Sequence, residues 1–160
     1  MGAPNPKLKP LGGHKWVLGR VETLDFPELQ IQGVECFVNT GVYSNILYCL
    51  HIDEEWVADQ KMIRVVPLPP RERFEPTAIS FFPWKPQKQV RNERGEVEVR
   101  YVIHTKVRVF GVEIPIELSL KEAFKVKYRV VLGRSFLKTR FLVDVGAINQ
   151  SAQYEKRRRS

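Results

Sequence analysis

Apolar and polar residues alternate most clearly along residues 97–120. Apolar side chains take every second position over 97–109 and again over 112–120, opposite mostly charged residues. Only Val102 interrupts the polar face of the first run. A period of two is typical of half-buried strands, so the pattern predicts a long antiparallel hairpin that turns at Phe110-Gly111. Pro115 confines its strand to an edge or a bulge because it lacks an N–H for the sheet.

Shorter apolar runs predict the remaining strands. Glycine and proline separate these runs, and no stretch of the sequence has the period of a long amphipathic helix. The predicted strands cover residues 15–26, 31–38, 46–52, 61–66, 129–132 and 141–145, with a turn at 53–55 and one short helical turn at 135–138. Short strands with this punctuation predict an all-β fold built as a small closed or partly closed barrel.

The chain has the composition of one globular domain with a different character at each end. Residues 1–14 contain three prolines and the pair Gly12-Gly13, which predicts a flexible N-terminal arm before a domain over 15–149. The formal net charge is +8. Residues 155–160 account for +3 of it, with one acidic and four basic side chains. We therefore predict a basic, disordered tail over residues 150–160.

A proline-rich segment follows the fourth predicted strand. Residues 67–86 hold six prolines and an apolar group that includes Phe81, Phe82 and Trp84. Such a segment either packs its aromatic side chains on the barrel or forms a mobile loop over a binding cleft. The sequence leaves both interpretations open.

An apolar strand that ends in a polar turn, over residues 35–42, carries the candidate chemistry. The strand stops at Asn39-Thr40-Gly41, which is how a β-barrel presents a side chain at its cleft. The turn resembles the Asp-Thr-Gly turn of retropepsin-like aspartic peptidases, with Asn39 in place of the catalytic Asp. Other segments resemble the bacterial members of this family that are labelled ATP-dependent zinc proteases. These segments are residues 19–24, 27–29, 90–105, 116–120, 131–137 and 141–144, so the resemblance covers about residues 16–149.

The resemblance implies a fold, an assembly and a set of site residues. The fold would be a retropepsin-like barrel with a longer flap region, in which Thr40 braces the turn and Gly41 supplies its sharp bend. Gly133 and Arg134 would pack beneath the turn, with Arg134 buried and bonded to backbone carbonyls or an acidic side chain. The alternative is an exposed arginine at the start of a short helical turn. Aspartic peptidases use two carboxylates that share a proton, and one chain supplies one turn, so the resemblance implies a homodimer. The candidates for the substrate cleft are Tyr43, Ser44, Phe81, Phe82 and Trp84.

Asn39 conflicts with the chemistry of this family. A carboxamide keeps nearly the shape of a carboxylate but cannot take a proton from water, so the chain is expected to be inactive or impaired as a hydrolase. Three explanations stay open: a natural pseudo-enzyme, a chain whose catalytic Asp was deliberately replaced, or a divergent enzyme that uses another carboxylate. Asp144 is the best-placed candidate for the third. Residues 42–45 and Tyr48 also depart from the family's pattern, so its substrate preference is not carried over.

The partners follow from charge and from the resemblance. The family includes a peptidase that acts on glutamate tails added to a ribosomal protein, which implies an acidic peptide or protein substrate, and a basic chain suits one. The alternative is a non-catalytic binding module that holds an acidic protein or a ribosomal partner, including its RNA. No cofactor or metal is predicted, because the three histidines are scattered and the sequence has neither a zinc-site spacing nor a Gly-Lys-Ser/Thr phosphate loop.

The sequence also predicts a compartment. No window approaches the length of an apolar membrane span, and the first residues lack the apolar core of a secretion signal. We therefore expect a cytoplasmic protein without membrane contact, in which Cys36 and Cys49 are reduced core thiols.

Overall fold

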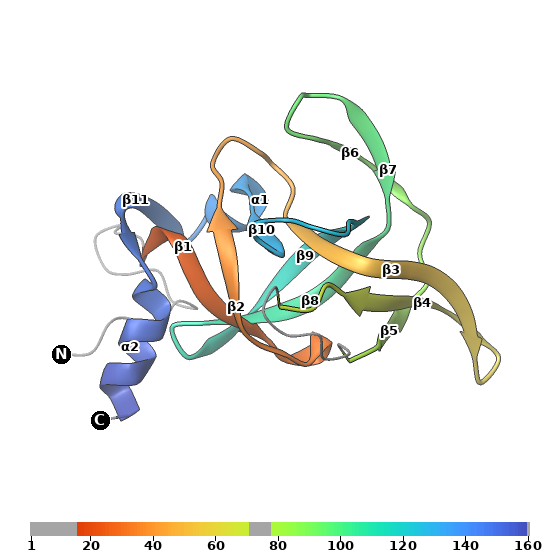
Figure 1. Ribbon diagram of the computed structural model, residues 1–160, viewed down its shortest axis with the longest axis horizontal. Helices are drawn as coiled ribbons and strands as arrows, with labels where there is room; N and C mark the ends of the chain where they lie inside the picture. Colours follow the sequence, from red (N-terminus) through yellow and green to blue (C-terminus); the bar gives the residue numbers. More distant parts are fainter. Residues whose placement is uncertain (1–15, 71–77, 160) are drawn as a thin grey trace.

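A computed structural model of the chain describes residues 16–70 and 78–159 (Figure 1). Its elements are β1 (Trp16–Phe26), the 3-10 helix η2 (Pro27–Leu29), β2 (Ile31–Val38), β3 (Ile46–Val57), β4 (Gln60–Pro67), β5 (Ser80–Pro83), β6 (Lys88–Arg91), β7 (Val97–Arg100), β8 (Val102–Val109), β9 (Val112–Glu122), β10 (Val130–Leu132), α1 (Arg134–Leu137), β11 (Phe141–Ile148) and α2 (Gln150–Arg159). The predicted all-β class is confirmed, and the short helical turn near residue 135 is α1.

Six strands close into a barrel of mixed pairing. In the order β10, β2, β1, β8, β9 and β3 each strand pairs with the next, and β10 also pairs with β3, which closes the ring. β10–β2 and β3–β9 are parallel pairs. The interior is filled by buried apolar residues of these strands, among them Leu18, Leu24, Leu47, Ile114 and Leu132. The small closed barrel expected from the sequence is confirmed.

Strand β10 lies between two strands that are distant from it in the sequence. Val130 pairs in parallel with Cys36 of β2 and in antiparallel orientation with Leu47 of β3. All three residues of β10 are buried, as a strand flanked on both sides requires. This arrangement brings the residues after β10 next to the turn after β2.

Cys36 and Cys49 are free and buried, as predicted, and burial raises the pKa of both thiols.

The hairpin predicted over residues 97–120 is confirmed from Val102 onward. β8 and β9 pair along their whole length, from Val102 with Ser119 to Val109 with Val112. The two turn residues, Phe110-Gly111, both have positive φ, which is the backbone geometry of a two-residue hairpin turn of the primed type. Pro115 of β9 lies outside the stretch, Ser119 to Glu122, that pairs with β3, so its missing N–H costs no bond to that strand.

The first part of the same prediction is wrong. β7 leaves the barrel sheet and pairs with β6 alone among the described strands, and the two project from the barrel as a separate hairpin (Figure 1). Val97 and Val99 are therefore exposed, by 52% and 58%, whereas Arg100 and Val102 are buried. The chain changes direction at Tyr101, between β7 and β8. The alternation continues through that residue, but its two halves belong to different sheets.

The sheet extends beyond the barrel through β3, β4 and β5. The predicted turn at residues 53–55 is wrong, since β3 continues to Val57 and turns at Ala58-Asp59, two residues with positive φ. β5 pairs with β4, with Ile63 opposite Phe82. Part of the proline-rich segment, residues 71–77, lies outside the described residues.

The basic tail predicted to be disordered is helix α2. The Glu22 carboxylate of β1 is buried and accepts hydrogen bonds from the N–H groups of Gln150 and Ser151, at 3.0 and 2.9 Å. These are two of the donors that a helix start leaves without intrahelical partners. Ser151 and Tyr154 are buried against the barrel. The side chains that fix the helix thus lie outside its basic residues. The predicted N-terminal arm, residues 1–14, lies outside the described residues.

Within residues 16–70 and 78–159, neither α1 nor α2 combines the length and apolar character that crossing a membrane requires.

Candidate active site

The turn predicted to carry the chemistry follows β2 at one end of the barrel. Oδ1 of the half-buried Asn39 accepts a hydrogen bond from the Gly41 N–H at 2.9 Å. A Cβ on Gly41 would lie only 3.1 Å from that oxygen, so glycine leaves room for the bond. Thr40 is exposed, and its hydroxyl makes no hydrogen bond to another described residue of the chain. The bracing predicted for Thr40 therefore needs a partner outside those residues.

Residues 39–45, which we call the turn loop, are bonded to the segment after β10. The Asn39 N–H donates to the Leu132 carbonyl, and the N–H groups of Arg134 and Ser135 donate to the carbonyls of Val42 and Tyr43, all at 2.9 Å. A Cβ on Gly133 would meet the Ser44 and Tyr43 carbonyl oxygens at 2.5 and 2.6 Å. Only glycine allows this approach, so the structure places Gly133 and Arg134 directly against the turn loop.

Arg134 lies beside the turn loop, but the expectation that it is buried is wrong. Its Nη1 donates to the Thr40 carbonyl at 3.0 Å, and its guanidinium carbon lies 5.9 Å from the centre of the Tyr43 ring. The side chain is exposed because Arg134 opens the single turn of α1, in which Phe136 and Leu137 take the interior positions. Arg134 thus bonds a backbone carbonyl of the turn, as expected, but from the solvent side.

This placement predicts a small stability effect for Arg134→Ala. One exposed hydrogen bond contributes about 0.5 to 1 kcal/mol, whereas a buried and bonded arginine would contribute about 3 kcal/mol or more. We expect the free energy of unfolding, measured with urea, to fall by about the smaller amount. Arg140→Ala serves as the nearby control. A loss of about 3 kcal/mol specific to Arg134 would contradict the exposed placement.

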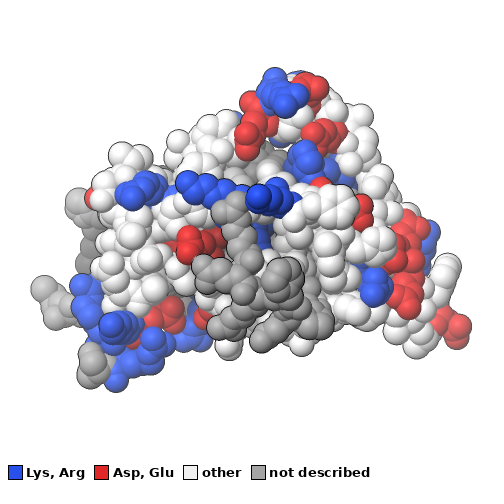
Figure 2. All heavy atoms as spheres, viewed as in Figure 1, with Lys and Arg blue, Asp and Glu red and all other residues white. Residues whose placement is uncertain are grey.

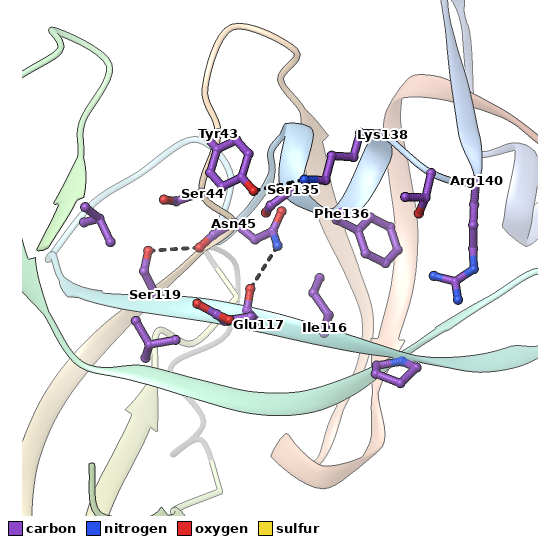
Figure 3. A pocket seen from close by; sticks show the side chains of 14 residues that line it. Tyr43, Ser44, Asn45, Ile116, Glu117, Ser119, Ser135, Phe136, Lys138 and Arg140 are labelled. Atoms are coloured by element: carbon purple, nitrogen blue, oxygen red, sulfur yellow. Dashed lines mark hydrogen bonds between the residues drawn. The ribbon is translucent and has the colours of Figure 1, made fainter. Parts of the chain in front are cut away.

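A hollow of about 360 Å³ opens between the turn loop, β9 and α1 (Figure 3). Two of the predicted cleft residues, Tyr43 and Ser44, line it, whereas Asn39, Thr40 and Gly41 are not part of its lining. The other described lining residues are Asn45, Val90, Val102, Pro115, Ile116, Glu117, Ser119, Ser135, Phe136, Lys138, Thr139 and Arg140.

Basic side chains surround Tyr43 at the rim of this hollow. Lys138 Nζ donates to the Tyr43 hydroxyl at 3.1 Å and lies 5.2 Å from the centre of its ring. Arg134 lies 5.9 Å from the centre of the same ring, and Arg140 lines the hollow at a distance from Tyr43, on the other side of Phe136 (Figure 3). The site also contains Glu117, whose carboxylate lies 3.6 Å from Lys88 Nζ and 3.9 Å from His104 Nε2. The described charged residues that line the hollow are thus two cations, Lys138 and Arg140, and one acidic residue, Glu117.

The three predicted aromatic cleft residues lie elsewhere. Phe82 packs into the barrel core from β5, Phe81 is exposed on the same strand, and Trp84 follows it. The Trp84 Nε1–H donates to Glu54 Oε2 at 2.7 Å, and the Tyr101 hydroxyl donates to the same oxygen. These hydrogen bonds lower the pKa of Glu54 to about 2, and the bond from Tyr101 has the largest effect. The structure therefore does not bring Phe81, Phe82 and Trp84 into the hollow with Tyr43.

The β6–β7 hairpin, rather than the proline-rich segment, is the described element that projects beside the turn loop. Val90 of β6 lines the hollow. The hairpin is held by Glu98, which bonds Asn92, Arg100 and Lys121 at distances from 2.5 to 3.3 Å. These bonds, led by that from Asn92, lower the pKa of Glu98 to about 2. Among the described residues the hairpin borders the hollow through Val90 and no residue of 67–86 lines it, so the loop interpretation of residues 67–86 stays a prediction.

Asp144 takes part in a local contact. Its Oδ1 accepts a hydrogen bond from the Gly146 N–H at 2.9 Å, on the edge strand β11. Asp144 pairs with Gly19 of β1, and β1 lies between β11 and β2. One strand therefore separates this carboxylate from the strand that carries the turn.

Sequence reasoning missed the residues that connect the site to its surroundings. Asn45, Ser119 and Arg100 are buried polar residues, of which Ser119 bonds the other two, and Glu22 caps α2. A buried polar residue on a strand gives no signal in a hydrophobic pattern, because its partners come from distant segments. Among the described residues, no group of three or more His, Cys, Asp or Glu side chains is placed to hold a metal ion.

Comparison with known proteins identifies the fold and its relatives. Residues 17–152 match the family described as RimB-like, retropepsin-like aspartic endopeptidase RimB. The chain is also similar to part of proteins named probable alpha-L-glutamate ligase: 25% identical over 144 residues to that of Shewanella halifaxensis, and 27% over 136 residues to that of Desulfotalea psychrophila. These matches cover 84% and 81% of this chain but only 29% and 28% of the relatives, so the chain spans less than a third of their length.

A solved structure has the same fold. A protein of unknown function from Legionella pneumophila superposes with a TM-score of 0.67 at 16% sequence identity, covering 85% of this chain and 98% of that protein. At this identity the likeness concerns the fold alone.

Proposed function

Since the chain belongs to the RimB-like family of retropepsin-like aspartic endopeptidases, we propose that its fold hydrolyses peptide bonds as a homodimer in which two turns of residues 39–41 meet. The observation that carries the proposal is the turn itself, in which the Asn39 N–H donates to the Leu132 carbonyl of β10 and the following residues Tyr43 and Ser44 lie closely against Gly133. As written, each turn offers the amide of Asn39 where the reaction needs a carboxylate. The chain is therefore inactive or strongly impaired.

The homodimer is supported by the surface of β1 and β11. β11 pairs only with β1 among the described strands, so its other edge is open. The two strands expose the apolar side chains Val17, Leu142, Val145 and Ile148, of which Val145 is 75% exposed. An open edge with apolar side chains is the kind of surface that a second copy covers.

We expect the chain to sediment as a dimer at micromolar concentration and Val145→Asp to shift it toward an 18.6 kDa monomer. A charge in an apolar interface loses its hydration without gaining a partner, which weakens association. Phe124→Asp is the matched control, because Phe124 is an exposed apolar residue, 94% accessible, that lies outside β1 and β11. Sedimentation showing only monomer for the parent chain would remove the shared site.

We propose an acidic peptide or protein as the substrate. The cations Arg134 and Lys138 lie near Tyr43, and Arg140 lines the same hollow, where these side chains would attract carboxylates. The relatives named as glutamate ligases contain a segment similar to this chain, and a peptidase domain associated with glutamate addition suits a substrate rich in glutamate. The basic side chains and the similarity to the glutamate ligases both indicate the class of substrate and leave its identity open.

The test compares the parent chain with Asn39→Asp on a protein that carries a glutamate tail and on a neutral peptide of equal length, at several pH values. Cleavage of the tailed protein by the Asp form supports the proposal. A folded and dimeric Asp form that cleaves neither substrate refutes the peptidase function.

A second candidate is a binding module that holds an acidic protein or a ribosomal partner without cleaving it. Asn39 favours this function, and so does α2, which presents Lys156, Arg157, Arg158 and Arg159 on a helix fixed to the barrel. Figure 2 shows Lys and Arg atoms gathered where Figure 1 places α2. Binding of an acidic partner that weakens steeply with salt in the parent chain, with no cleavage by Asn39→Asp, favours this candidate. Deleting residues 156–159 then tells whether α2 or the hollow holds the partner.

A further inference from the structure

Arg100 connects the β6–β7 hairpin to the barrel. Its guanidinium is buried, with the residue 5% exposed, and donates from Nε and Nη2 to Glu98 Oε2 at 2.9 and 2.5 Å. Its Nη1 donates to the Ser119 hydroxyl on β9 at 3.2 Å. The apolar residues Val97 and Val99 of the same hairpin are exposed. A hairpin with so little apolar burial depends for its position on polar anchors such as this one.

Ser119 links Arg100 to the turn loop. Its hydroxyl has a single hydrogen, which it donates to the Asn45 carbonyl at 2.9 Å, and it is therefore an acceptor toward Arg100 (Figure 3). The Ser119 N–H donates to the same carbonyl at 2.8 Å. Ser119 and Asn45 are both buried, so water cannot replace either bond without opening the structure.

Asn45 completes the path to the candidate catalytic turn. Its Nδ2 donates to the Glu117 carbonyl at 2.9 Å, and its Oδ1 accepts from the Gly133 N–H at 2.8 Å. Gly133 belongs to the segment whose neighbours bond Asn39, Val42 and Tyr43. At the other end of the path, Glu98 Oε1 accepts from Asn92, whose own Oδ1 accepts the N–H groups at the tip of the hairpin.

We propose that Arg100, Ser119 and Asn45 are positioning residues that couple the β6–β7 hairpin to the turn loop, so that the position of the hairpin fixes the geometry of the turn. Continuous networks of buried hydrogen bonds that have few alternative partners carry such coupling. The proposal deepens the proposed function, on which its consequence for peptide cleavage rests. The coupling itself is a property of the fold and is measurable without any activity.

The test changes residues of the network near the hairpin and measures hydrogen exchange in the turn loop. Hydrogen exchange followed by mass spectrometry is compared between the parent chain, Glu98→Gln and Ser119→Ala. Glu98 is partly exposed and lies outside the barrel, so Glu98→Gln keeps the test open should Ser119→Ala fail to fold. We expect exchange in residues 39–45 to rise by about threefold to tenfold in Glu98→Gln, the range that network mutations commonly give.

Thr105→Val is the matched control, because Thr105 is also buried and its hydroxyl donates to Glu28 at 2.9 Å away from the hollow. It should leave exchange in residues 39–45 as in the parent chain. The proposal is overturned if Glu98→Gln raises exchange only in residues 92–100, or if Thr105→Val raises it equally in residues 39–45.

A kinetic comparison in the Asn39→Asp background separates this proposal from the proposed function. There, Glu98→Gln is expected to lower kcat by about threefold or more, because the coupling acts on the geometry of the turn that would carry the catalytic carboxylate. An unchanged kcat overturns the coupling. An inactive Asn39→Asp chain refutes the peptidase function instead, and the exchange result alone then decides the coupling.

Discussion

Replacing Asn39 with Asp is expected to raise the rate of peptide cleavage by at least about a hundredfold, from a level close to background. A positioned general base contributes about 10²- to 10⁴-fold, and the amide of Asn39 supplies no such base. The turn is ready for the change, because Asn39 Oδ1 already accepts the Gly41 N–H, a bond that one carboxylate oxygen can keep. The second oxygen would then be available to water. Initial rates on a glutamate-tailed protein measure the effect.

The pH profile tells a restored dyad from a nonspecific effect of charge. Two carboxylates that meet across a two-fold axis share one proton, so the rate should peak between two apparent pKa values that belong to the pair. Asn149→Asp adds the same charge at the start of α2, where an acidic residue is tolerated, and should leave the rate at background. A flat pH profile, or equal rates in the two variants, would contradict the shared site.

The barrel could be predicted because its residues carry a local signal. β8 and β9 alternate with a period of two, and the Phe110-Gly111 turn separates them at the point where the structure turns. The segment around Gly133 could be found for another reason, the resemblance of its Gly-Arg pair to the family pattern. The structure explains the glycine, because the Tyr43 and Ser44 carbonyls approach too closely for a Cβ.

Other features could not be predicted because they depend on distant partners. The apolar positions keep their period of two through Tyr101, and only Val102 interrupts the polar face, yet the chain leaves the barrel sheet there. The family resemblance implies a buried Arg134, but in a single helical turn the next residues fill the interior. Helix α2 has a basic, polar sequence without an apolar stripe, so the information that fixes it lies in Glu22, more than a hundred residues away.

We expect Glu22→Ala to lower the free energy of unfolding by about 3 kcal/mol or more. The carboxylate is fully buried and accepts three backbone N–H groups: Gly19 at 2.7 Å, Gln150 at 3.0 Å and Ser151 at 2.9 Å. Each buried donor left without a partner costs about 1 to 3 kcal/mol, less whatever water can recover at the new cavity. Thermal or urea unfolding measures the loss. Glu96→Ala removes an exposed carboxylate 3.9 Å from Arg94 and should cost under about 0.5 kcal/mol.

The Glu22→Ala variant should also release α2 from the barrel. A double-mutant cycle can show that the loss of stability and the release of the helix have one cause. Deleting residues 150–159 from the parent chain leaves the Glu22 carboxylate with only the Gly19 donor, so we expect a large loss of stability. In the Glu22→Ala background the same deletion removes a helix that has already lost its cap and should cost less by about 1 kcal/mol or more. Exchange at residues 150–159 should rise in Glu22→Ala before global unfolding. Additive losses, with α2 still protected, would mean that Ser151 and Tyr154 hold the helix without the help of Glu22.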